Sequence, residues 1–451
     1  MSTSEASRRS AGAPPIVVVG GGLAGLATAV RLAKARHPVR LYESSDRLGG
    51  RWASRTRTFS GGSVVLDDAP SVLEFPAPWR DLYRKSGRTL AEEFDRSAAA
   101  LSAAEPARYR FADGIELSWP TDRGELFAVH EKQYGTAVAV RWRDLVDHLD
   151  DVWQTVRKLG WEAELTGKAE LTGPVRRRIH QEQTVADLAD EIGHPQLAAV
   201  LRAGAYRQGG DPETTPAWCA VTQSIERRFG RWTVQSDCAD DDRDRTGRTS
   251  TLVDALIARA RLRRVDVRLN ERVDQLDLER GQVRGVVTTR ERLTTTAVVW
   301  TADPWQLPAA GLPRLLARGL RRHLRRLHPA QAPRVTHDLR PPSGDWSTGR
   351  VEELVELDQH GVPTVTYTRP VTAGTLLSVH DWQHRRPDPG AGAAWRGFDS
   401  WLDRPPVRSG LDRLLLAGPW SPAGNSAAAT ILSGALASYA VHDLVSGGRA
   451  R

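Results

Sequence analysis

Residues 16–33 read IVVVGGGLAGLATAVRLA. The apolar run at 16–19 predicts a buried parallel strand, and the small and apolar residues after the glycines predict a helix over 23–35. A glycine turn between such a strand and such a helix is typical of a dinucleotide site, where a pyrophosphate meets a helix N-terminus. The turn alone does not decide which dinucleotide binds, and a glycine turn without a ligand would show the same pattern.

The glycines of this turn have different expected roles. Gly20, Gly22 and Gly25 occupy the three positions of G-x-G-x-x-G. The first permits a tight turn, the second lets a pyrophosphate approach the backbone, and the third lets the helix pack on the strand. The backbone N–H groups of Leu23 and Ala24, at the helix start, are expected to face the phosphates.

The next segment supplies an acid at the distance that such a site needs. VRLYE at 39–43 predicts a second strand that ends in Glu43. An acid about 20 residues beyond the glycine turn suits a ribose hydroxyl, so we predict that Glu43 and the adjacent Ser44 contact the cofactor. The order of strand, glycines, helix, strand and acid favours a bound dinucleotide over an unliganded turn.

A second glycine turn follows in SSDRLGGRWAS at 44–54. Here the sequence resembles the FAD-binding fingerprint of the flavin amine oxidase and phytoene desaturase superfamily, which Gly49, Gly50 and Arg51 match. A glycine pair lets the backbone pass close to the cofactor, and Arg51 can neutralise pyrophosphate charge. An NAD dehydrogenase would not need this turn, and an ordinary surface turn is the alternative. The resemblance implies FAD as the cofactor.

The resemblance continues, with departures, along the chain. In the family's F-D-x-G-P segment, Asp67 and Pro70 match, whereas Ala69 replaces the glycine and predicts a changed backbone, since alanine tolerates positive φ poorly. Further on, Trp232 matches a predicted strand, but the glycine pair before the next helix has become Gly247-Arg248.

Later segments of the chain are also expected to belong to the cofactor domain. Strands predicted within 265–304 return the chain to the cofactor domain, and the resemblance implies a main-chain contact from Val273 to the adenine side. RLLLAGPWSPAGNSAAATILSGALASYAVHDLV at 413–445 resembles the family's C-terminal FAD motif, in which Gly418 and Ser433 are the predicted contacts. Pro419 stands where many relatives carry an acid that bonds the ribityl chain.

Periodicity predicts the remaining elements. A hairpin is expected around Asp113-Gly114, and apolar residues at helical spacing predict helices over 136–160 and 183–203. Their apolar stripes would either line a tunnel or form a core. GLPRLLARGLRRHLRRLH at 311–328 predicts a basic amphipathic helix, which would either lie on an anionic membrane or pack its leucines on the core. Asp303 is expected only to cap a turn.

We found no convincing metal site in the sequence. The acidic insert DCADDDRDRT at 237–246 lacks the glycine and the terminal glutamate of an EF-hand, so a solvated loop is expected. His380 and His384, in HDWQH, lack the glutamate of a zinc-binding HExxH helix.

The bulk composition narrows the class of protein. The chain has 451 residues, 40% of them hydrophobic and 26% charged, which is typical of a globular protein. The net charge is +8, but arginines are spread along the chain among many acids, so no nucleic-acid partner is expected. Two cysteines, Cys219 and Cys238, favour a reducing, cytoplasmic setting. Arg8-Arg9 could open an export signal, but we interpret residues 1–14 as a disordered tail.

These observations predict an α/β fold, a Rossmann-like FAD-binding domain of the GR2 type with an inserted α+β substrate domain. The expected domains are a tail at 1–14, an FAD-binding domain made of 15–100, 246–306 and 406–447, and a substrate domain made of 101–245 and 307–405. The inserted region would hold an apolar substrate beside the flavin.

The resemblance implies an FAD-dependent desaturase of the phytoene desaturase type, which dehydrogenates C–C bonds of a carotenoid or other polyprenoid. The catalytic residue stays unassigned. Peripheral contact with the inner face of the membrane would bring in a lipid-soluble substrate. An amine oxidase, an isomerase or saturase on the same fold, and a flavin-binding protein with little turnover are the alternatives. Loss of flavin on purification would favour the last, and hydrogen peroxide from a small amine would favour the first.

Overall fold

The computed structural model describes residues 13–96, 99–236, 245–314, 317–341 and 350–446. Most of the predicted tail, most of the acidic insert with Cys238, and Leu315 and Leu316 of the predicted basic helix lie outside these ranges.

The first glycine turn belongs to a five-stranded parallel sheet with the order β18-β13-β1-β2-β9. Its strands are β1 (Ile16–Val19), β2 (Val39–Tyr42), β9 (Asp266–Arg268), β13 (Ala297–Trp300) and β18 (Leu414–Leu416). Every residue of β1 and β13 is buried, as their continuous apolar runs predict for strands that are covered on both faces. The sheet confirms the predicted Rossmann-like fold class.

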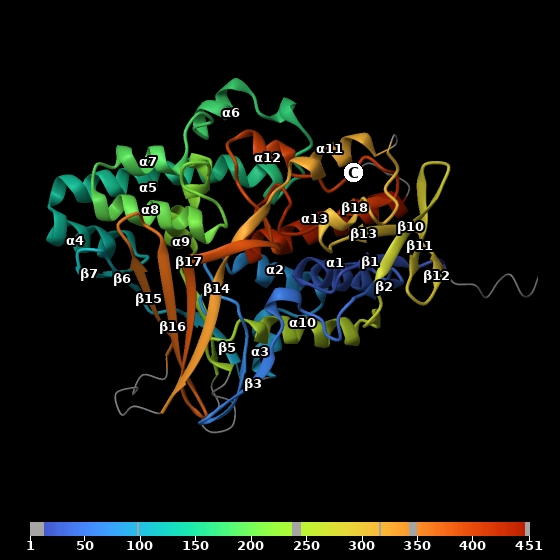
Figure 1. Ribbon diagram of the computed structural model, residues 1–451, viewed down its shortest axis with the longest axis horizontal. Coiled ribbons are helices and arrows are strands. Elements are labelled where there is room, and N and C mark those ends of the chain that lie inside the picture. Colours follow the sequence, from blue (N-terminus) through green and yellow to red (C-terminus); the bar gives the residue numbers. More distant parts are fainter. Residues whose placement is uncertain (1–12, 97–98, 237–244, 315–316, 342–349, 447–451) are drawn as a thin grey trace, which may run out of the picture.

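Helices cover one face of this sheet and a small sheet covers the other (Figure 1). The helices are α1 (Leu23–Lys34), α2 (Ala77–Ser86), α3 (Leu90–Asp95), α10 (Ser250–Leu262) and α13 (Ala427–Val445). The opposite face meets β10 (Val273–Glu279), β11 (Gln282–Thr288), β12 (Arg292–Thr294), the turn η7 (Pro304–Gln306) and α11 (Arg318–Arg326). Gly434 permits the close packing of α13 on α1, since a Cβ there would lie 2.8 Å from the Ala24 carbonyl oxygen.

Helix α13 is the one described helix that is long and apolar enough to cross a membrane. Its most apolar part is 61% buried inside the protein, where it packs on α1 and β18. This burial is what a core helix of an α/β domain requires.

A six-stranded sheet with the order β14-β17-β16-β15-β6-β7 forms the second half of the molecule (Figure 1). Its strands are β6 (Ala107–Arg110), β7 (Glu116–Trp119), β14 (Pro329–Arg340), β15 (Glu352–Leu357), β16 (Pro363–Val371) and β17 (Gly374–Ala393). The helices beside it are α4 (Arg123–Tyr134), α5 (Thr136–Val156), α6 (Gly173–Arg178), α7 (Val185–Glu191), α8 (Pro195–Arg207), α9 (Thr222–Phe229) and α12 (Asp399–Asp403). Short elements join these parts: β3 (Arg55–Phe59), β4 (Gly62–Leu66), β5 (Ala99–Ala103), β8 (Trp232–Ser236), η2 (Gly50–Trp52), η3 (Arg157–Trp161), η4 (Lys168–Glu170) and η5 (Ala217–Val221).

The predicted middle elements are partly confirmed. Strands β6 and β7 form the hairpin around Asp113-Gly114, and α5 fills 136–156 with its apolar stripe in the core. The single helix predicted over 183–203 is wrong, because α7 and α8 occupy this stretch separately. Gly193 between them has a φ of +62°, outside helical geometry, and Pro195 starts the second helix.

The basic helix predicted over 311–328 is shorter than expected, since α11 has 9 residues. Its leucines point inward, and Leu312, Leu320, Leu324 and Leu327 are all buried against the five-stranded sheet. Of the two interpretations of its amphipathic pattern, the packing supports the core role for the leucines.

Two buried histidines predict acid sensitivity of the fold. Burial, with nearby His194, lowers the pKa of His130 to about 4, and burial lowers that of His380 to about 3. Between pH 6.5 and 4 the unfolded chain therefore binds more protons than the folded one, so stability falls as the pH falls through this window.

For His130 we expect a loss of about 2 kcal/mol between pH 7 and pH 5. His130 lies among Tyr134, Trp119 and Trp142, so His130→Phe suits its surroundings and should reduce the pH dependence by that amount. Urea unfolding at both pH values measures the change, with exposed His384→Gln as the control. An unchanged pH profile in His130→Phe would contradict the assignment.

Candidate cofactor and substrate site

The first glycine turn has the geometry that the motif predicts. Gly20 has a φ of +103°, and a Cβ on Gly25 would lie 1.9 Å from the Gly20 carbonyl oxygen, so both positions require glycine for the fold itself. A Cβ on Gly22 would meet nothing within 4 Å. The turn therefore leaves open space at the glycine where a pyrophosphate approaches the backbone. Leu23 and Ala24 start α1 directly beside it.

Glu43 lies at the end of β2 and is hydrogen-bonded to this turn. Its Oε2 accepts a bond of 2.7 Å from the N–H of Gly21, and its Oε1 accepts one of 2.8 Å from the N–H of Ser45. Ser44 Oγ also donates to Oε1 at 3.3 Å, so these bonds hold the carboxylate at the end of the strand and leave Oε2 a further lone pair. Ser44 is exposed next to it.

The second glycine turn packs on the first. The N–H of Gly49 donates to the Gly21 carbonyl at 2.8 Å, and a Cβ on Gly50 would lie 3.2 Å from Cα of Gly22. Arg51 follows with 44% of its side chain exposed, and its Nε lies 3.6 Å from Oδ2 of Asp388 on β17. The structure thus brings both predicted glycine turns to one place, with a cation beside them.

Val273 lies at the start of β10, near the acid end of this site. The adjoining N–H of Glu271 donates to the Glu43 carbonyl at 2.9 Å, and Val273 itself is buried in register with Thr288. The segment that the resemblance assigns to the adenine side therefore touches the end of β2.

The C-terminal motif joins the same sheet through β18 and α13. Ser433 is buried, and its Oγ accepts a bond of 3.0 Å from the N–H of Gly418 while donating to the Thr430 carbonyl at 2.7 Å. Ser433 thereby holds the Ala417-Gly418 turn on α13. Pro419 turns its carbonyl toward Gly392 of β17, where a Cβ would lie only 2.6 Å away.

Two departures from the family pattern are accommodated by the backbone. Ala69 does not have a positive φ, so the backbone at this position is not strained by the alanine that replaces the family's glycine. Asp67 holds the segment instead, because its carboxylate accepts from the N–H groups of Ala69 at 3.1 Å and Ser250 at 2.7 Å. Gly247 keeps its positive φ of +68°, and Arg248 after it lies 3.6 Å from Asp254.

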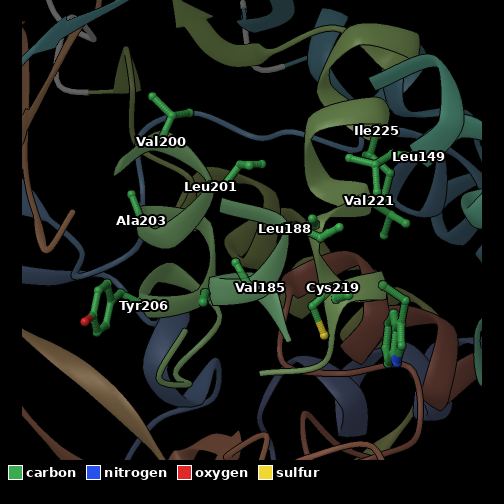
Figure 2. Close-up of a cluster of buried hydrophobic side chains, with 14 of the residues drawn as sticks. Leu149, Val185, Leu188, Val200, Leu201, Ala203, Tyr206, Cys219, Val221 and Ile225 are labelled. Carbon is green, nitrogen blue, oxygen red and sulfur yellow. The ribbon is translucent and has the colours of Figure 1, made fainter. Parts of the chain in front are cut away.

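A cavity of about 230 Å³ adjoins these turns. Arg51 and Trp52 line it on one side, and Ser426 and Ala427, at the start of α13, line it on another. Its walls are mostly apolar and aromatic, and the aromatic side chains are Trp52, Phe75, Trp79, Tyr109, Trp161, Trp218, Tyr367, Trp382 and Trp395. Of the apolar cluster in Figure 2, Val200, Ala203, Val221 and Ile225 also line the cavity. The apolar stripe of α5 packs in the core and lines no part of this cavity, so the core interpretation holds for it. In the other stretch predicted to be helical, 183–203, Val200 and Ala203 do line the cavity.

The sequence motifs did not predict a polar group in the cavity wall. Asp68 lines the cavity, and His337 Nε2 lies 2.9 Å from its Oδ1 while His337 Nδ1 lies 2.9 Å from Ser378 Oγ. Arg55 donates to both oxygens of the same carboxylate. Although burial alone would raise it, the bonds from His337 and Arg55 hold the pKa of Asp68 well below its ordinary value.

A buried arginine, also missed by the sequence analysis, organises the C-terminal loop. Arg404 donates to the carbonyls of Ala393 and Ser421 and to Asn425 Oδ1, and its guanidinium stacks over the ring of Trp395. Trp395 and Asn425 line the cavity, so Arg404 connects β17 to the loop before α13. The residues that Arg404 contacts belong to segments far apart in sequence, so no local sequence pattern predicts these contacts.

The two histidines of HDWQH lie in different surroundings. His380 is buried in the cavity wall, whereas His384 is exposed and pairs with Asp381. Among the described residues there is no group of three or more potential metal ligands. Asp303 caps a turn as expected, because its Oδ1 accepts from the N–H of Trp305.

Comparison with known proteins agrees with this geometry. The FAD binding domain family model matches residues 15–366. Phytoene dehydrogenase of Streptomyces griseus is 28% identical over 292 residues, which cover 64% of this chain and 54% of that protein. Phytoene desaturase (lycopene-forming) of Pantoea ananas is 25% identical over 293 residues, which cover 64% and 56%. This chain thus spans about half the length of the curated relatives that it matches.

Solved structures share the fold over nearly the whole chain. Putrescine oxidase bound to putrescine superposes with a TM-score of 0.66 at 15% identity, covering 96% of this chain and 99% of that one. Cyclohexylamine oxidase from Brevibacterium oxydans superposes with a TM-score of 0.62 at 14% identity, covering 96% and 100%. At these identities the likeness concerns the fold alone.

The chain belongs to the FAD binding domain family, and FAD is its cofactor. The matches also confirm the resemblance to phytoene desaturase-like flavoproteins. The residues fit FAD, because open space at Gly22, the carboxylate of Glu43 and the adjoining second glycine turn occur together.

Proposed function

We propose that this protein is an FAD-dependent oxidoreductase of the phytoene desaturase type, which removes hydrogen from C–C bonds of a carotenoid or other polyprenoid. One observation carries the proposal: an aromatic-lined cavity opens directly beside the two glycine turns. Such a cavity excludes water and accepts a long apolar chain. The curated phytoene desaturase relatives support the same substrate class.

We propose the following contacts with FAD. Gly20, Gly22, Gly25 and the N–H groups of Leu23 and Ala24 receive the pyrophosphate, and Glu43 with Ser44 receives the ribose. Gly49, Gly50 and Arg51 cover the phosphates, Val273 reaches the adenine side, and Gly418 with Ser433 supports the flavin end. FAD, when bound, supplies the hydride acceptor that the protein alone lacks.

The chain's own contribution to the reaction would be positioning and electrostatics. The cavity walls hold the apolar chain in place and keep water away. A carbon that loses a hydride gains positive charge, and the ionised carboxylate of Asp68, fixed by Arg55 and His337, would stabilise that charge. The second hydrogen leaves as a proton to solvent or to a base that we do not assign.

A membrane position belongs to the same proposal. Arg318, Arg322 and Arg325 lie on α11, whose leucines face the core. We propose that the protein works in the cytoplasm, with this basic helix against the anionic inner face of the membrane from which a lipid-soluble substrate would enter.

Among the alternatives, an amine oxidase has a specific observation in its favour. The fold matches putrescine oxidase over nearly the whole chain, and a carboxylate, that of Glu226, lines the cavity. An isomerase or saturase, or a flavin-binding protein with little turnover, would use the same cofactor site.

Anaerobic flavin reduction tests the proposal. Micellar phytoene should bleach the visible absorbance of the FAD-loaded protein, and Asp68→Asn should slow the bleaching about 100-fold, since a fixed charge aimed at the transition state is lost. The matched control is Asp338→Asn, an exposed acid of β14. Hydrogen peroxide release from putrescine, with no bleaching by phytoene, would contradict the proposal and support the amine oxidase.

A further inference from the structure

One wall of the cavity is polar, in contrast to its aromatic remainder. Arg207 of α8, Glu226 of α9, Glu74, Tyr109 of β6 and Tyr367 of β16 all line it. These residues come from five separate segments, and none belongs to the proposed FAD contacts. A hydrocarbon substrate would have no use for them, so their chemistry bears on what the cavity binds.

The charged members are partly paired with one another. A nitrogen of Arg207 lies 2.7 Å from Oε1 of Glu74 and 3.7 Å from Oε1 of Glu353, which lies behind the wall. Glu353 is also paired with Arg231. Glu226 stands apart, because its nearest cation, Nε of Arg231, is 3.9 Å away, beyond hydrogen-bond distance.

Three side chains of this wall lack a hydrogen-bond partner. Within the described ranges, neither the carboxyl of Glu226 nor the hydroxyls of Tyr109 and Tyr367 make a hydrogen bond, although the three residues are only 8%, 5% and 1% exposed. Their oxygens reach the cavity space and are not enclosed in the packed core, and a ligand that displaces solvent there without pairing them would leave them unpaired at a cost. Each lines the cavity, so a ligand in the cavity is their available partner.

The charge of the wall indicates a neutral ligand group. Burial, together with Glu74, raises the pKa of Glu226 to about 7, and burial raises the pKa of Tyr109 to about 12. The raised pKa favours the neutral carboxyl of Glu226, and the charges of Glu74 and Arg207 cancel as an ion pair, so this wall carries little net charge. A carboxyl and two phenols then offer both donors and acceptors, which complement a hydroxyl group.

We propose that the substrate is an amphiphile, an apolar chain with a neutral hydroxyl group that binds between Glu226, Tyr109 and Tyr367. This inference rests on the proposed function for the chemistry of the chain, and deepens it by assigning the substrate an oxygenated group. A bare hydrocarbon would leave three buried polar groups unpaired. An ammonium group would meet the guanidinium of Arg207 in the same wall.

Paired ligands test the inference. The FAD-loaded protein is titrated with a long polyene hydrocarbon and with the same polyene carrying a terminal hydroxyl, in identical micelles. Quenching of the cavity tryptophans measures binding, and anaerobic bleaching of the flavin measures reaction. We expect the hydroxylated chain to bind about tenfold more tightly, the effect of one satisfied buried hydrogen bond.

Substitutions in the polar wall test which side chains cause the preference for the hydroxylated chain. Tyr367→Phe removes one oxygen, and Glu226→Met removes the carboxyl, so each should reduce the tenfold preference to about threefold or less. Tyr439→Phe is the matched control, because it removes the same atom from an exposed tyrosine of α13 and should keep the full preference. Tyr367→Phe keeps the inference falsifiable should Glu226→Met fail to fold.

The outcomes separate this inference from the proposed function. Tighter binding of the hydroxylated chain without bleaching by either chain would support the inference and refute the reaction. Equal binding of both chains would overturn the inference, and bleaching by both would still support the reaction. An amine-terminated chain that binds more tightly than the hydroxylated one would also overturn it.

Discussion

Gly22→Ala should yield a folded protein that does not retain FAD, with an affinity lowered by at least about 100-fold. The reason is that a Cβ at this position meets no protein atom within 4 Å, so the fold accepts it. The same Cβ occupies the space through which a pyrophosphate would reach the N–H groups of α1. Flavin content after purification and titration of apoprotein with FAD measure the loss.

Gly25→Ala provides the contrast for this experiment. Its Cβ would lie 1.9 Å from the Gly20 carbonyl oxygen, so the turn and α1 cannot keep their positions. We expect Gly25→Ala to lower thermal stability of the apoprotein as well as FAD content, whereas Gly22→Ala lowers FAD content alone. If Gly22→Ala bound FAD like the parent protein, the pyrophosphate would have to bind elsewhere.

Arg231→Met should lower the free energy of unfolding by about 3–5 kcal/mol, because it removes one partner of a buried ion pair. The side chain of Arg231 is 4% exposed and that of its partner Glu353 is 1% exposed. After the substitution, the one ion-pair partner left to Glu353 among the described residues is Arg207 at 3.7 Å, and Glu226 loses its nearest cation. Urea unfolding of purified protein measures the loss.

The double variant Arg231→Met with Glu353→Met should recover much of this loss, since the uncompensated carboxylate is removed as well. Arg110→Met serves as the control, because Arg110 pairs with Glu116 and Glu356 at the exposed edge of the same sheet. Such surface pairs contribute little, and the control should change stability by less than about 1 kcal/mol. If the double variant were as unstable as Arg231→Met alone, the lost free energy of unfolding would come from packing and not from the uncompensated carboxylate.

The cofactor half of the molecule was predictable from the sequence because its chemistry is local. Gly25 and Glu43 are determined by contacts within one strand–turn–helix–strand unit, and Gly20 by its positive φ in the same turn, so their spacing alone indicates their geometry. Ser433 was predicted from the resemblance as a cofactor contact, and the structure adds that it holds the Gly418 turn.

The region around the cavity was less predictable because its groups converge from distant segments. Glu74 of the loop before α2, Arg207 of α8 and Glu353 of β15 meet, and no spacing in the sequence encodes such a cluster. The break between α7 and α8 was visible as Gly193 and Pro195, but the apolar periodicity on both sides concealed it. The amphipathic pattern of α11 also allowed two interpretations, a membrane-facing helix or a helix packed on the core. Only the packing of its leucines distinguishes them.

The strand order of the parallel sheet has a consequence for how the chain is made. Strand β13 lies between β1 and β18, which are separated by nearly the whole sequence, and α13 packs on α1. A nascent chain that has emerged only as far as β17 therefore exposes an unpaired edge of β13 and the apolar face of α1. Contacts of such high sequence separation slow folding and leave these surfaces open to aggregation until α13 docks.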